Sequence, residues 1–92
     1  MNAAHDESGM IEKFLGPERA SGSPFDLLGV PPKDLAPAEV VGALEGRLAE
    51  IDRHPECRTP SADEVRLALH ATAAQLMDPV VRGVLIRQWG QS

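Results

Sequence analysis

Residues 37–53 have the sequence PAEVVGALEGRLAEIDR, and this stretch decides the fold. Its apolar residues recur at intervals of three and four, so on a helix they share one arc about 100° wide. The arc holds Val40, Val41, Leu44, Leu48 and Ile51. Pro37 suits the first helical position, because the N–H that proline lacks has no partner there in any helix. The stretch therefore predicts a helix over residues 37–53 that turns this arc toward a core.

A second long helix is predicted over residues 62–77. Ser61-Ala-Asp-Glu64 has the form of a capping box, in which a hydroxyl and a carboxylate satisfy free N–H groups at a helix start. The main apolar face of this helix holds Val65, Leu69, Thr72, Ala73 and Leu76. Pro55 forbids one continuous helix through both stretches. We therefore expect the two helices to pack antiparallel, as a hairpin whose tip is the loop around Pro55.

Two shorter helices are predicted beside this hairpin. Ser23 and Pro24 have the residue types of an N-cap and a first helical position, and Gly29 has that of a residue just past a helix end. They enclose a brief helix over residues 25–28. Asp78-Pro79 repeats the start signal before a last helix over residues 80–89, which is apolar nearly all round. No stretch alternates in the way a strand does, so the chain is predicted to be all-α.

The N-terminal part is predicted to be a separate, partly helical segment over residues 1–22, followed by a helical domain over 23–90. Residues 1–9 are small and acidic and are expected to be a disordered lead. Met10, Ile11, Phe14 and Leu15 form an apolar stripe that is too short to be helical without a surface to dock on. Residues 20–23 are expected to be a flexible linker.

The composition narrows the classes of partner. The 92 residues include nine Lys and Arg against fourteen Asp and Glu, a net charge of −5. Nucleic acid and anionic membranes are bound mainly through Lys and Arg, so neither is an expected partner. One cysteine excludes an internal disulfide and favours a reducing compartment. No apolar run approaches the roughly 20 residues of a membrane span, and the start of the chain lacks the pattern of a signal peptide. We therefore expect a cytoplasmic protein.

Asp52, His54, Glu56, Cys57 and His70 are the candidates for metal binding or nucleophilic catalysis. Structural zinc takes four ligands, commonly including a pair of cysteines. A Cys–His nucleophile needs a third group that orients the base, and a pocket for the substrate. One cysteine with scattered histidines meets neither requirement. We expect no metal, no cofactor and no enzymatic activity.

The order of motifs resembles the J-domain, a co-chaperone family. Phe25-Asp-Leu-Leu-Gly-Val30, the helix led by Pro37, the loop His54-Pro55-Glu56 and Leu76-Met-Asp-Pro-Val-Val-Arg82 follow one another as the family's motifs do. The resemblance covers about residues 23–87. It implies a small four-helix fold with a central antiparallel helix hairpin. It also implies that a heat-shock chaperone contacts the hairpin-tip loop, here His54, Pro55 and Glu56, together with the basic residues Arg47 and Arg53.

Two departures from the family pattern bear on that activity. Glu56 stands where the family has Asp, and the extra methylene moves the carboxylate. The family's second helix is basic and meets an acidic patch on the chaperone, whereas residues 39–53 hold four acids against two arginines. Acidic surfaces repel, which slows and weakens the encounter. We expect a protein-interaction adaptor, at the front of a longer protein, that does not stimulate chaperone ATPase turnover. The alternative is a working J-domain co-chaperone.

One side of the helix over residues 37–53 is a candidate interaction surface. Gly42, Gly46 and Ala49 line it at helical spacing. Glycine inside a helix costs about 1 kcal/mol relative to alanine, and small residues let a partner backbone approach closely. The alternative is an exposed face that tolerates them.

Leu67, Ala71 and Ala74 form a second apolar face on the helix over residues 62–77. An uncovered apolar face is a liability, so we expect residues 10–15 or the last helix to cover it. Phe14 is expected to pack on or near this face, in its own chain or in a second copy. These two arrangements correspond to a monomer and a weak homodimer.

Overall fold

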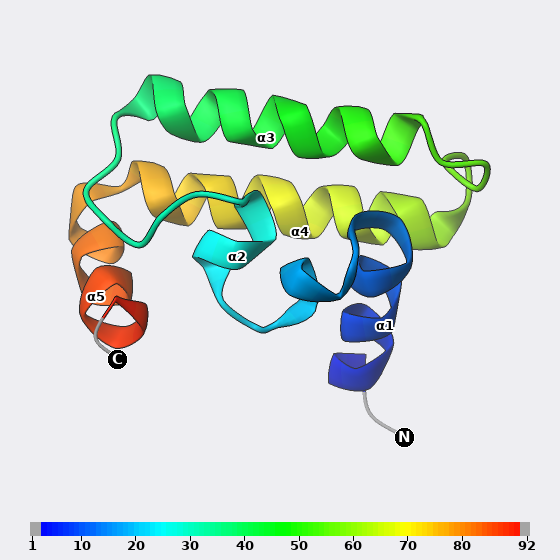
Figure 1. Ribbon diagram of the computed structural model, residues 1–92, viewed down its shortest axis with the longest axis horizontal. Coiled ribbons are helices and arrows are strands. Elements are labelled where there is room, and N and C mark those ends of the chain that lie inside the picture. Colours follow the sequence, from blue (N-terminus) through cyan, green and yellow to red (C-terminus); the bar gives the residue numbers. More distant parts are fainter. Residues whose placement is uncertain (1–2, 91–92) are drawn as a thin grey trace.

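The computed structural model describes residues 3–90, and this part of the chain is helical with no strand (Figure 1). Its elements are α1 (Ala3–Leu15), the 3-10 helix η1 (Pro17–Ala20), α2 (Pro24–Leu28), α3 (Pro37–Asp52), α4 (Pro60–Met77) and α5 (Pro79–Trp89). The prediction of an all-α chain is confirmed. The described residues form five α-helices, because the N-terminal segment contributes a helix of its own in addition to the four predicted in the domain.

The centre of the fold is the antiparallel pair of α3 and α4, which lie side by side in Figure 1. Val40 and Ile51 of α3 are fully buried against α4 residues of the predicted apolar face. Those are Val65, Leu69, Ala73 and Leu76. Leu44 and Leu48 pack against this core and remain half-buried. The predicted arc is too wide at Val41, which is 39% exposed.

The start of α4 corrects the predicted capping box. Thr59, not Ser61, is the N-cap: its hydroxyl accepts a hydrogen bond from the Ala62 N–H at 3.3 Å and donates to the Glu56 carbonyl at 2.8 Å. Pro60 then occupies the first helical position, which proline suits. The hydroxyl beside that proline is the one with the geometry of a cap, so the helix begins two residues earlier than predicted.

The disordered lead predicted over residues 1–9 is wrong for residues 3–9, which belong to α1; residues 1–2 lie outside the described range. The stripe on α1 supplies the reason. Ile11, Phe14 and Leu15 are buried in the same core as α3 and α4, so docking provides the stabilisation that a short helix lacks alone. After α1 comes η1, which ends at Ala20, the first residue of the stretch expected to be a linker. In that stretch the Ser21 hydroxyl donates a hydrogen bond to the Asp26 carboxylate at 2.7 Å.

The predicted signals around α2 are confirmed. The Ser23 hydroxyl accepts hydrogen bonds from the N–H groups of Phe25 and Asp26 at 3.2 and 3.4 Å. Gly29 ends the helix with φ of 78°, a left-handed conformation that glycine adopts without strain. A Cβ at Gly29 would also collide with the guanidinium groups of Arg19 and Arg47. Both arginines donate hydrogen bonds to carbonyl groups of α2, those of Asp26 and Leu28.

Asp78 joins α4 to α5, as predicted. It ends α4, and its carboxylate accepts hydrogen bonds from the N–H groups of Val80 and Val81. Arg82 fastens the first turn of α5, donating to the Leu76 carbonyl and pairing with Asp34, both at 2.8 Å. No residue of α5 is itself buried. None of the described helices is both long and apolar enough to cross a membrane.

Candidate functional site

The hairpin tip is held by α1. The ring of Phe14 lies 4.6 Å from that of His54, centroid to centroid, at an angle of 59°. The backbone N–H of Glu56 donates to His54 Nδ1 at 3.0 Å, and Lys13 Nζ donates to Glu56 Oε1 at 2.7 Å. Two of the three hairpin-tip residues predicted from the sequence are therefore engaged by α1. Pro55 is exposed beside them.

Glu56 forms an ion pair with Lys13 at the hairpin tip. The hydrogen bond from Lys13 holds the pKa of Glu56 below its usual value, and the charges of Lys13 and His54 act in the same direction. The carboxylate remains half exposed to solvent. Screening by water and salt keeps such a contact weak. The ion pair therefore adds only a small amount to the stability of the contact between α1 and the hairpin tip.

Replacing Glu56 tests this contact through its pH dependence. Because the folded state lowers the pKa, the contact stabilises the protein fully above the usual value of 4.5 and is lost as the pH falls through the folded pKa. We expect Glu56→Gln to lower the melting temperature slightly at pH 7 and to leave it unchanged well below pH 4.5. Thermal melts of both proteins over that range measure the difference. Glu64→Gln, at an exposed carboxylate in no ion pair of the described residues, is the control. A Glu56→Gln effect that stays constant with pH would contradict the assignment.

The two arginines predicted to accompany the loop have different positions. Arg47 donates from Nη1 to the Leu28 carbonyl at 2.7 Å and pairs with Glu50, so it fastens the end of α2 to α3. Arg53 is the C-cap residue of α3 and is exposed next to the loop. The structure therefore places Arg53 with His54, Pro55 and Glu56, and gives Arg47 a structural contact.

The small residues of α3 lie on an open face. Gly42 is exposed, and Gly46 and Ala49 are half-buried. A Cβ built on either glycine meets nothing within 4 Å. No close approach among the described residues requires glycine at these two positions.

The prediction that Leu67, Ala71 and Ala74 are covered within the chain is wrong. All three are exposed, Leu67 by 65%. Phe14 lies at the hairpin tip against His54, and not on this face. A shallow surface of alanines offers a large ring less apolar contact than the core that Phe14 shares with Ile11 and Leu15.

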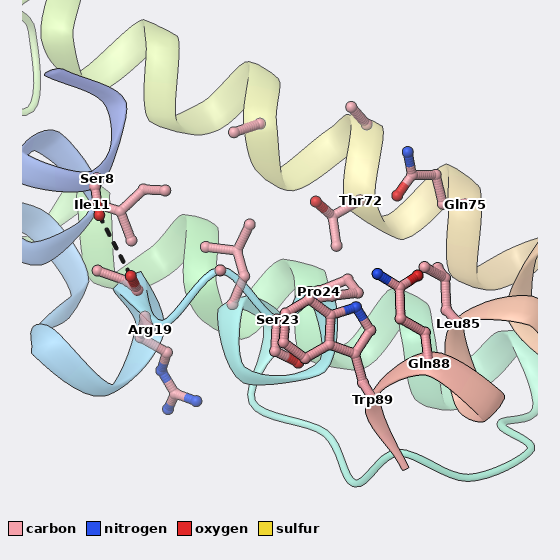
Figure 2. Close-up of a pocket in the computed structure, with 15 residues that line it drawn as sticks. Ser8, Ile11, Arg19, Ser23, Pro24, Thr72, Gln75, Leu85, Gln88 and Trp89 are labelled. Atoms are coloured by element: carbon pink, nitrogen blue, oxygen red, sulfur yellow. Dashed lines mark hydrogen bonds between the residues drawn. The ribbon is translucent and has the colours of Figure 1, made fainter. Parts of the chain in front are cut away.

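A groove runs beside this face, between α1 and η1 on one side and α5 on the other (Figure 2). Its cavity volume is about 530 Å³. Ala68 and Ala71 of α4 lie along it, Ile11 and Leu27 bound it toward α1 and α2, and Trp89 bounds it toward α5. Ala71 thus belongs both to the predicted face and to the groove. Sequence reasoning missed the groove because five separate elements form it.

The described residues hold no cluster of three or more His, Cys, Asp or Glu side chains placed to bind a metal ion. Cys57, the free thiol, is half-buried in the hairpin-tip loop. The hairpin tip and the groove are two candidate interaction surfaces within residues 8–90. Comparison of the chain with models of protein families, with curated proteins and with solved structures found no match.

Proposed function

We propose that the chain is a non-enzymatic protein-interaction module on a divergent J-domain-like scaffold, and that its partner binds α4 and α5. The exposed apolar side chains carry this proposal. Within residues 8–90, five of the six large ones belong to these two helices, among them Val80, 75% exposed, and Leu67, 65% exposed. Exposed apolar surface of this kind is typical of protein-interaction sites. The chemistry suits a partner with an apolar surface of its own.

The contacts of the hairpin tip support an adaptor over a working co-chaperone. If the domain is a working co-chaperone, His54 and Glu56 contact the chaperone. Here the Glu56 carboxylate is paired with Lys13, and the His54 ring packs on Phe14. A chaperone that contacts these two side chains must either displace α1 or bind them while they remain in contact with α1. The acidic residues of α3 add repulsion toward an acidic patch on the chaperone.

An ATPase assay separates the two functions. We expect the domain, mixed with a heat-shock chaperone and ATP, to leave the hydrolysis rate near its basal value. Glu56→Asp alone should not restore stimulation, because the acidic α3 and the contact of His54 with Phe14 both remain. A J-domain that carries His-Pro-Asp is the positive control. A several-fold stimulation by the unmodified domain that disappears in His54→Gln would replace the adaptor with the co-chaperone.

A further inference from the structure

The groove of Figure 2 is lined by small side chains of α4 and by larger side chains of α1 and α5. Ala68 and Ala71 are the small ones on α4. Ile11 and Trp89 are large ones that lie on opposite sides of the groove. Small lining residues leave room for large side chains of a partner. Leu67, one helical turn before Ala71, extends the apolar surface past the groove. A partner helix that buries apolar residues one turn apart is the recognition mode that fits such a groove.

The groove itself carries little charge. Arg19 is the one charged residue among the described residues that line it. Its Nη1 donates to the Asp26 carbonyl at 3.2 Å, and in Figure 2 its guanidinium points away from Thr72 and Gln88. The remaining polar lining is neutral, with hydroxyl and amide groups. An ionised partner side chain buried in such a groove would lose its hydration with little compensation.

Acidic residues flank the groove without entering it. Glu12 on α1 is one helical turn beyond Ser8, and Glu64 on α4 is one turn before Ala68. Both glutamates are exposed, and neither forms an ion pair within residues 8–90. The chain as a whole carries −5, which steers cationic partners toward it. On the α1 and α4 side of the groove the exposed charges are therefore acidic and complement basic residues of a partner, whereas Arg87 stands next to Gln88 on the α5 side.

We propose that the groove binds an amphipathic helix of a partner protein, with apolar side chains against Ala68 and Ala71 and Lys or Arg along its edges near Glu12 and Glu64. The proposal rests on the interaction module described above and specifies the chemistry of its partner. The same net charge on two copies disfavours a second copy of this chain as the occupant.

Trp89 provides the measurement, because it is the single tryptophan of the chain and it lines the groove. The probes are two synthetic amphipathic peptides of about 18 residues, long enough to form helix. One has Leu on one face and Lys on the other, and the second has Glu in place of every Lys. We expect the Leu–Lys peptide to give a saturable shift of the Trp89 emission. The Leu–Glu peptide should bind about tenfold more weakly or worse, a difference of ~1.4 kcal/mol.

Two matched variants locate the binding. Ala71→Lys and Ala74→Lys change the charge equally at exposed alanines of α4, and only Ala71 lines the groove. We expect Ala71→Lys to raise the Kd of the Leu–Lys peptide about tenfold and Ala74→Lys to change it by less than about twofold. Circular dichroism melts verify that both variants fold.

Three results would overturn the proposal. Equal weakening in the two lysine variants would remove the groove as the site, and equal affinity for the two peptides would remove the basic partner. Failure of the unmodified chain to bind the Leu–Lys peptide would remove both. Each leaves the interaction module in place, whereas stimulation of the chaperone ATPase would remove the module whatever the peptides do.

Discussion

Leu69→Ala is expected to lower the free energy of unfolding by about 2–5 kcal/mol, the range for a fully buried leucine. Leu69 is 0% exposed in the core of the α3–α4 pair. The loss is a large share of the total, since a domain of this size is stable by about 5–14 kcal/mol. Urea denaturation followed by circular dichroism measures it. Leu44→Ala, at a half-buried position on the facing helix, should cost less.

Leu67→Ala is the matched control for Leu69. It makes the same chemical change two residues away on the same helix, where the side chain is 65% exposed. We expect it to change the free energy of unfolding by less than about 0.5 kcal/mol. Equal losses at the two positions would mean that the faces of α4 are assigned incorrectly.

Phe14→Ala is expected to cost about 3–5 kcal/mol, because Phe14 is 6% exposed and joins α1 to the hairpin. The same change should move the NMR resonances of the His54 ring, which lies 4.6 Å from the Phe14 ring. Urea denaturation and a proton spectrum of the imidazole provide the two measurements. A loss of stability with unchanged His54 resonances would contradict the contact between the rings.

Glu12→Ala is the control for Phe14, since Glu12 is an exposed residue of the same helix. We expect little change in stability or in the His54 spectrum. A large effect would mean that α1 is sensitive to any substitution, and the loss at Phe14 would then not report on its burial.

Local signals predicted the helix ends well. Ser23, Gly29 and Asp78 act on N–H and C=O groups within a few residues of themselves, so their roles follow from neighbouring sequence alone. The two long helices were predictable because burying one face requires a regular apolar period. Thr59 and Ser61 show the limit of this approach. Two hydroxyl residues two positions apart both suit an N-cap, and only the backbone conformation shows that Thr59 is the one.

Contacts between distant residues were not predictable. Lys13 and Glu56 are 43 residues apart, and many carboxylates were available to that lysine. Phe14 could pack in the core or on the face of Ala71 and Ala74. Which of the two buries its ring better depends on the three-dimensional shape of both surfaces. The residues of the hairpin-tip loop could be identified from the sequence. Their contacts with α1 could not.

The attachment of α5 has a consequence for how the groove responds to an occupant. This helix begins at Asp78, is fastened through Arg82 and contributes no buried residue. Segments with few buried apolar contacts open at a small fraction of the global free energy of unfolding. The amides of α5 should therefore exchange with deuterium sooner than those of α3 and α4. Ile11 is buried in the core, whereas the helix that carries Trp89 has no buried residue. We therefore expect the α5 side of the groove to move first when a partner helix of larger diameter binds.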